Sequence, residues 1–517
     1  MKLPKLNYLI VITVLLGIYY LVCGVYLNKL GYYTPESLFF IEKTRVIFEG
    51  IGNKLKLVGL TSPLLPFYIT FPFTSISAEL APVMASATGT SVLFYLLARK
   101  LTEKVKDDFY LVLLLLLFLL HPAILYVASS GRAVYLSLIF FYVFYVNIFK
   151  YYKANTTFHI SIASICLVIL IFCDYKFIWL TLFFIPLVFS IAVHSLNLGE
   201  KESIFRITQS FNSPSLRRKL INKTFAMYVI MFSLPMATVL CYKLLNLTNA
   251  NDLDYFHESP YATWTVLAER LNYEMLVSNI NFKSPDVSLL ISVKVIFICP
   301  MMLLAIFMYR DSNYQILTLA APFAFIEFLH IKYEKVSLEY EYYLMFVVLA
   351  LLAVVLKIHT IKNKRLFKSV MAAIVLVQIG TGFYYIKNSP VADEKNFISM
   401  LLNRTVDARQ DENKDMANYI NGLPDNAKIL ADDAIAYPII AFTYNIKSLT
   451  LPYQESYLSA IETPWDYDNY ILIATAKNKV NAYSMLNPRY GPIASMAGTN
   501  KLQLVYSTQN WALYRLL

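Results

Sequence analysis

The fold is decided by residues 8–50, which read YLIVITVLLGIYYLVCGVYLNKLGYYTPESLFFIEKTRVIFEG. Residues 8–27 are almost entirely apolar, and a helix of that length crosses about 30 Å of hydrocarbon. A cleavable signal peptide would have a shorter apolar core followed by small residues, so this segment predicts a retained transmembrane helix. The polar residues that follow it then begin a loop outside the membrane.

Composition identifies the whole chain as an integral membrane protein. Of its 517 residues, 58% are hydrophobic and only 15% are charged, and the mean hydropathy is +0.53, well above a soluble domain. The five cysteines lie in apolar segments, which excludes a disulfide framework and a zinc knuckle. The net charge of +11 follows the sides of the membrane, so we expect no nucleic-acid partner.

Further apolar segments along the chain give about eleven transmembrane helices in all. Only helices satisfy their own backbone groups in lipid at these lengths, so the membrane part is predicted to be all-α. The additional segments are 78–98, 109–127, 133–149, 158–173, 177–193, 224–243, 288–308, 315–331, 343–356 and 369–386.

Basic residues set the expected orientation. Short loops containing ARKLTEKVK (98–106), LRRKLINK (216–223) and KIHTIKNKR (357–365) are rich in Lys and Arg, which indicates the cytoplasmic side. We therefore expect a multi-pass protein of the plasma (inner) membrane with its N-terminus inside. The loops 28–77 and 244–287 then face outward.

The chain is predicted to have two domains, a transmembrane domain (1–387) and an extracytoplasmic α/β domain (388–517). Short apolar segments alternate with helical ones in the tail. The clearest are AKILADD, SLTLPY, NYILIATA, KLQLVYS and NWALYRLL. Asp432 and Asp433 follow the first of them, either as ligands at a strand end or, as capping preferences favour, at the start of a helix.

The first outer loop carries an acid in a defined position. Thr34 and Pro35 predict a helix start, Glu36 lies in its first turn, and Gly50 marks its end,. A carboxylate there is either a simple helix-capping acid or part of a site. The helix dipole is expected to lower the pKa of Glu36 and keep it ionised at neutral pH.

This loop resembles the first loop of the GT-C glycosyltransferases, which use polyprenyl-phosphate sugars and include the protein O-mannosyltransferases and the lipid A aminoarabinose transferases. The resemblance rests on the loop acid, the helix that ends in Gly, and the Pro-Leu segment GLTSPLLPFYITFPF (59–73). Relatives have an acid pair where this chain has Pro35-Glu36. One carboxylate is a poor divalent-metal site, which argues against a bound divalent metal without excluding one, and no other cofactor is indicated; one acid suffices for a general base.

Two cations are predicted to bind the donor phosphate. Lys176, in FCDYKFIWL, corresponds to a lysine that many GT-C chains have at the start of this helix. Arg132, in the outer turn SSGR, replaces the acid that relatives often have there and suits bidentate contact with phosphate. The alternative for both is a basic side chain at the membrane interface.

A third group of ionisable residues lies near the outer end of the ninth segment. Glu327, His330 and Lys332 fall within one short stretch, and charge at this depth indicates a site unless it is paired. Lys332 is a further phosphate candidate, and Glu327 and His330 are candidate site-lining residues. Glu341-Tyr342 occupies the place where relatives often have Arg-Tyr.

The second large outer loop adds His257, Glu258 and Arg270 as candidate site-lining residues. Such a loop either covers an active site, as in the resembled class, or forms a helical cap with solvated charges. The spacing of these three residues does not indicate a catalytic role, which favours the helical cap.

The resulting hypothesis is a membrane glycosyltransferase that inverts the sugar, with Glu36 deprotonating an acceptor lipid, glycan or protein on the extracytoplasmic face. Two alternatives remain open. One is a non-catalytic GT-C-like scaffold or lipid-binding subunit, which the missing acid before Glu36 favours. The other is a transporter or flippase of lipid-linked sugars, which would need broken helices in paired halves. The sugar and the acceptor are not defined by the sequence.

Overall fold

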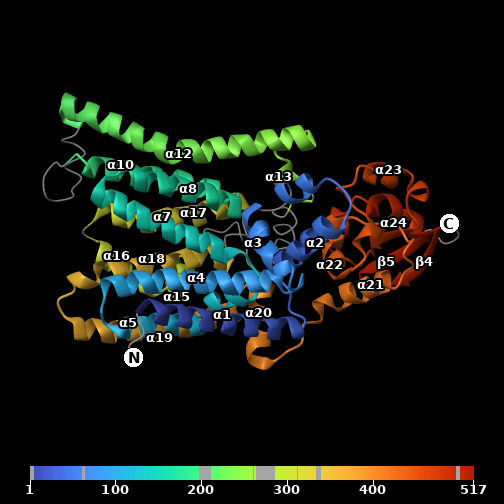
Figure 1. Ribbon diagram of the computed structural model, residues 1–517, viewed down its shortest axis with the longest axis horizontal. Coiled ribbons are helices and arrows are strands. Elements are labelled where there is room, and N and C mark those ends of the chain that lie inside the picture. The colour runs from blue at the N-terminus through green and yellow to red at the C-terminus, as the bar shows by residue number, and fades with distance from the viewer. Residues whose placement is uncertain are drawn as a thin grey trace.

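The computed structural model describes residues 5–60, 64–196, 211–259, 261–262, 286–310, 312–333, 339–495 and 501–517. A bundle of long helices lies at one end of the molecule, and a smaller α/β unit that contains the C-terminus lies at the other end (Figure 1). Short segments, including α2 (Pro35–Glu49), α3 (Leu64–Thr74) and α13 (Tyr255–Glu258), lie between the two. This intermediate layer contains the first outer loop.

The helical bundle is that of a multi-pass membrane protein. Within the described ranges, eight helices are long and apolar enough to cross a membrane, and two bent pairs raise the number to ten. The apolar helix α8, with 17 residues, corresponds to the remaining expected segment. The eight are α1 (Lys5–Lys29), α4 (Ala81–Lys104), α7 (Val134–Ala154), α9–α10 (Phe177–Phe183, Ile185–His194), α12 (Pro214–Ala250), α17 (Asn313–Tyr333), α18 (Tyr340–Lys357) and α19 (Lys364–Lys387).

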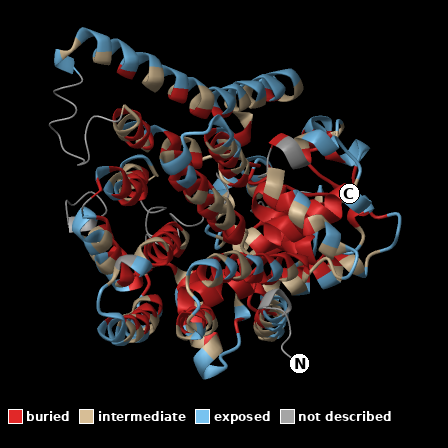
Figure 2. Ribbon diagram, turned by 60° about the vertical axis from the view of Figure 1, so that its left-hand side comes forward, coloured by how far each residue is buried: buried red, intermediate tan, exposed pale blue. Residues whose placement is uncertain are grey.

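Burial separates inner from peripheral helices. The central α18 is 83% buried over its apolar window, whereas α12 is 17% buried over its own. Figure 2 shows α12 as a mostly exposed helix along one side of the bundle. Many of its exposed side chains are apolar, among them Phe225, Met236 and Leu240. In a membrane protein such a surface faces lipid, since hydrocarbon is as apolar as the side chains.

Two spans are broken inside the bundle. The pair α5 (Asp108–Leu120) and α6 (Pro122–Ser129) bends by 62°, and the pair α15 (Asp286–Ile298) and α16 (Met301–Tyr309) bends by 94°. Pro122 and Pro300 explain the positions, because proline removes a backbone donor and clashes with the preceding turn. The breaks meet: the His121 Nε2 atom lies 3.2 Å from the Ile298 carbonyl oxygen.

The tail folds as the expected α/β unit. Its five strands, in the order β2-β1-β3-β5-β4, pair in parallel between β1 and both β2 and β3, and antiparallel from β3 to β5 and β4. The strands are β1 (Ile429–Leu430), β2 (Leu449–Thr450), β3 (Tyr470–Ala474), β4 (Leu502–Ser507) and β5 (Trp511–Leu516). The helices of the unit are α21 (Asp411–Asn421), α22 (Asp433–Phe442), α23 (Tyr457–Glu462) and α24 (Asn487–Ser495). Helix α20 (Ala392–Asn403), which begins the tail, packs instead on the bundle, where the Phe397 ring contacts Tyr32 and Tyr126.

Helix α22 begins as the capping preference predicted. The Asp432 side chain accepts a hydrogen bond from the Ala434 N–H at 3.1 Å, which satisfies one of the free donors of the first turn. Its other carboxylate oxygen accepts from the Met485 N–H at 2.6 Å. These bonds give Asp432 the structural role of a helix cap, the second of the two roles that the sequence allowed.

Helix α2 joins the two parts of the molecule through a buried ion pair. The Lys43 ammonium lies 2.5 Å from Asp433 of α22 and 3.2 Å from Glu42, and all three side chains are at most 1% exposed. The hydroxyl of Tyr453 also contacts both Lys43 and Asp433. Because a buried charge is stable only when paired, these contacts fix α2 against the α/β unit.

We expect Asp433→Asn to destabilise this junction. Removing one partner of a buried ion pair costs on the order of 3–5 kcal/mol, so the thermal midpoint in detergent should fall by several degrees and proteases should cleave the α/β unit faster. Asp466→Asn, at an exposed site in the same unit, is the matched control. Equal midpoints for the two variants would refute a structural role for the pair.

Candidate functional site

The start of α2 positions Glu36 as the sequence predicts. Thr34 caps the helix by accepting from the Ser37 N–H, and Pro35 occupies the first helical position. Glu36 Oε2 accepts from Arg132 Nε at 3.1 Å, and its Oε1 accepts from the Ala133 N–H at 3.1 Å. The carboxylate therefore faces the turn between α6 and α7.

Arg132 lies at the centre of a cluster of carboxylates. It follows Gly131, whose φ of +76° is a left-handed conformation that favours glycine,. Its Nη2 atom lies 2.6 Å from Glu341 and 3.3 Å from Glu339, both at the start of α18. With the bond to Glu36, one guanidinium contacts three carboxylates. All four side chains are 12–16% exposed.

Lys176 joins the same cluster from the turn between α8 and α9. Asp174 accepts from the Lys176 backbone N–H at 2.9 Å, and its other oxygen lies 3.1 Å from the Lys176 ammonium. Tyr342 donates its hydroxyl proton to Asp174 at 3.3 Å. Glu341 precedes Tyr342 on α18, so the carboxylates around Arg132 and the Asp174–Lys176 pair are neighbours.

Burial dominates the electrostatics of this cluster. It raises the pKa of Glu36, although the Arg132 charge opposes the shift, and it also raises the pKa of Asp174. The expected lowering of the Glu36 pKa by the helix dipole is therefore wrong. The pKa of Glu339 rises to about 8 because of burial and the neighbouring Glu341 charge.

An apolar cavity opens beside the lysine end of the cluster. It has a volume of about 610 Å³ and lies between α9–α10 and the exposed helix α12. Trp179, one turn after Lys176, lines it, together with Thr181, Val229 and Met236. A cavity of this size and character suits a hydrocarbon chain.

Lys332 lies at the same end, but its two companions on α17 face elsewhere. The Lys332 ammonium is 3.8 Å from the centre of the Trp179 ring, which lines the cavity. Glu327 accepts a hydrogen bond from Ser288 of α15 at 2.9 Å, and the described structure gives His330 Nδ1 no hydrogen-bond partner. No contact of Glu327 or His330 with the Arg132 cluster is found among the described residues.

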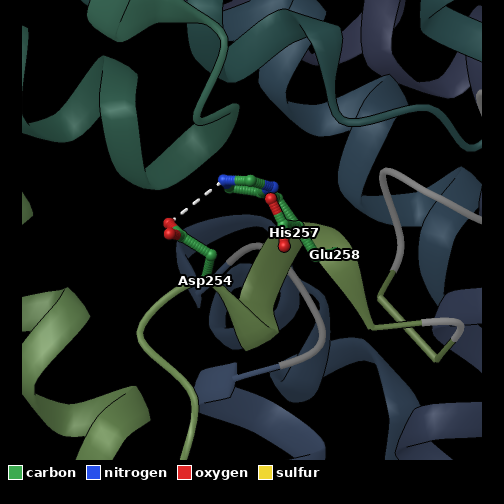
Figure 3. A group of neighbouring side chains, drawn as sticks. All are labelled: Asp254, His257 and Glu258. Atoms are coloured by element: carbon green, nitrogen blue, oxygen red, sulfur yellow. Dashed lines mark ion pairs between the residues drawn. The ribbon is translucent and has the colours of Figure 1, made fainter.

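The second outer loop forms another polar group beside the Lys176 turn, where the His257 and Tyr175 ring centres lie 5.9 Å apart. Asp254, which precedes α13, and His257 and Glu258 within α13 offer ligand atoms within 4.8 Å of one another (Figure 3). Asp254 is already paired with His257 at 3.2 Å and with Lys243 at 2.6 Å, so a metal would compete with an ammonium. Arg270 lies outside the described residues, as does Pro63 of the Pro-Leu segment.

Sequence reasoning missed Asp174, Glu339 and Glu341 as members of the cluster. Asp174 lies two residues before Lys176, so a charge pair across that turn was a usable signal. Glu341 was noted only because it stands where relatives have Arg. Its link to Arg132 depends on the fold, which brings residues 209 positions apart together.

Taken together, the fold and the cluster define a multi-pass membrane protein with a charged site at one end of its bundle, beneath an α/β unit. No family model and no curated protein matches the sequence. Among solved structures, ArnT from Cupriavidus metallidurans bound to undecaprenyl phosphate matches with a TM-score of 0.50 at 12% identity, over 98% of each chain. The chain thus shares the overall fold of that structure, with an all-α membrane part and a C-terminal α/β unit, as the sequence predicts.

We expect Glu339→Gln to change how stability depends on pH. Because the folded-state pKa of Glu339 is about 8 and its ordinary value is 4.5, the folded protein retains this proton while the unfolded chain loses it. The stability contributed by the proton is complete below pH 4.5 and is lost as the pH rises to 8. The variant lacks this loss, so its thermal midpoint relative to wild type should increase from pH 5 to pH 8.5. A constant difference would contradict the shift.

Proposed function

We propose that this protein is an inverting membrane glycosyltransferase that moves a sugar from a polyprenyl-phosphate donor to an acceptor hydroxyl on the extracytoplasmic face. One observation carries the proposal: Glu36, Arg132 and Lys176, which come from three segments far apart in the sequence, form one charged cluster beside an apolar cavity. An interfacial Arg or Lys that only met lipid headgroups would not gather with carboxylates in this way. The GT-C fold supports the same chemistry.

The donor is proposed to lie across the boundary between the cavity and the cluster. Its isoprenoid chain occupies the apolar cavity, where each buried CH₂ contributes about 0.8 kcal/mol. Its phosphate lies near Lys332, whose ammonium lies over the Trp179 ring, and Lys176, one turn before Trp179. Arg132 is not used for the phosphate here, because its guanidinium already contacts three carboxylates.

Glu36 acts as the general base. It takes the proton of the acceptor hydroxyl while the acceptor oxygen attacks the anomeric carbon, and the bond from that carbon to the phosphate oxygen breaks. The products are the glycosylated acceptor and polyprenyl phosphate, whose new charge Lys176 stabilises. A pKa raised by burial suits this role, since a base is most effective when its pKa approaches the working pH.

The bond between Arg132 and Glu36 supplies the orientation. One Glu36 oxygen is held by the guanidinium and the other by the Ala133 N–H, so the carboxylate cannot rotate away. Each oxygen keeps a second lone pair, which remains available for the acceptor proton.

A transporter of lipid-linked sugars is the second candidate, and the two bent helix pairs that meet at His121 and Ile298 favour it. Broken spans inside a membrane domain are typical of transporters. Transport, and equally a scaffold role, requires no proton abstraction. Variants of Glu36 therefore distinguish these candidates from a transferase.

We expect Glu36→Gln to lower the rate of sugar transfer about 10²–10⁴-fold, the usual contribution of a general base. Glu49→Gln is the matched control, because Glu49 ends the same helix and is exposed. The assay uses purified protein, a radiolabelled polyprenyl-phosphate sugar and lipid, glycan and protein acceptors. Full transfer by Glu36→Gln would exclude the base, and absence of transfer by wild type with every donor and acceptor would favour transport or a scaffold.

We expect Val229→Trp to raise the KM for a long-chain donor about tenfold or more, because the indole fills space that several CH₂ groups would occupy. A donor with two isoprene units, too short to reach far into the cavity, should be affected much less. Leu240→Trp places the same ring on the exposed face of α12 and serves as control. Equal effects of Val229→Trp on both donors would argue against this location of the chain.

A further inference from the structure

The structure assigns Arg132 the place that a divalent cation would take among these carboxylates: we infer that the site carries its own cation and that removing the guanidinium creates a divalent-metal site. The inference about Arg132 deepens the proposed function. Only its sugar-transfer assays depend on that function; the metal-binding measurements do not. Arg132 is thereby a positioning residue, which acts through Glu36 and the carboxylates of α18.

The contacts of Arg132 explain why. Its Nε atom binds Glu36 at 3.1 Å, and its Nη2 atom binds Glu341 at 2.6 Å and Glu339 at 3.3 Å. Its Nη1 atom donates to the Tyr126 hydroxyl at 3.3 Å. All three nitrogens of the guanidinium are therefore engaged, and carboxylates from two helices converge on one positive group.

Hard divalent ions prefer the same arrangement, several carboxylate oxygens converging on one point. Here that point is filled, and a divalent ion brought to it would lie against a guanidinium that stays protonated. Like charges this close repel strongly in a site with little solvent. The residues present thus do not fit a bound metal while Arg132 is in place.

Without the guanidinium, the electrostatics of the site would favour a divalent ion. Glu36, Glu339 and Glu341 would remain close together, with Lys176, which is paired with Asp174, and Lys294, which lies near Glu339, as neighbouring positive charges. The mutual repulsion of the three carboxylates would favour any cation that bridges them. A small side chain at position 132 also leaves space for the ion.

Manganese binding tests this directly. The purified full chain is titrated with Mn²⁺ and the free ion is followed by electron paramagnetic resonance. All proteins carry His257→Ala, so that the Asp254 group contributes little. We expect H257A/R132A to bind one equivalent of Mn²⁺ at least about tenfold more tightly than H257A binds the ion, and the addition of E341Q to H257A/R132A to weaken that binding about tenfold.

Two results would overturn the inference. One is Mn²⁺ binding by H257A that E341Q removes, because the cluster would then take a metal despite Arg132. The other is H257A/R132A that elutes as a folded monodisperse protein yet binds no more Mn²⁺ than H257A. If that variant does not fold, H257A/R132K, which keeps the charge, and H257A still decide the matter: both should bind no ion that E341Q displaces.

Transfer assays add a separate readout. Wild-type transfer should be unchanged by EDTA, and its loss on chelation with recovery on added Mn²⁺ would overturn the inference. If wild type transfers no sugar under any condition, the proposed function fails, but the Mn²⁺ titrations still test the place of Arg132.

Discussion

The arrangement of the charged end of the bundle depends on one guanidinium, that of Arg132. Glu36 begins α2, whereas Glu339 and Glu341 flank the start of α18, and carboxylates this close repel one another in a poorly solvated site. Arg132 is the positive group that contacts all three. The first outer loop can therefore approach α18 only because the turn after α6 inserts a cation between them.

Helix α2 extends this constraint to the α/β unit. Glu36 and Lys43 are seven residues apart, which places them on nearly the same face two turns from each other. Glu36 is bonded to Arg132 and Lys43 to Asp433, so one rigid helix connects the membrane cluster with the tail. Movement of the α/β unit along α2 would shift the carboxylate as well.

Local signals in the sequence predicted local structure well. Thr34, Pro35 and Gly50 gave the bounds of α2, apolar length gave the spans, and Asp432 gave the start of α22, because each depends on neighbours within a few residues. The partners of Arg132 and Lys43 could not be obtained in this way. Glu36 and Arg132 are 96 residues apart and Lys43 and Asp433 are 390. The predicted direction of the Glu36 pKa shift was wrong for the same reason. Burial by distant segments raises this pKa by more than the dipole of the residue's own helix lowers it.

The distribution of charge also suits the direction of the proposed displacement. Carboxylates predominate around Arg132, whereas Lys176 and Lys332 lie toward Trp179 and the apolar cavity. A single displacement needs a base on one side of the anomeric carbon and stabilisation of the departing phosphate on the other. A phosphate among the carboxylates would be repelled, and a base among the lysines would be too weakly basic. The excess of carboxylates around Arg132, with Lys176 and Lys332 toward the cavity, therefore favours one orientation of the donor, with its phosphate toward the cavity and its sugar toward Glu36.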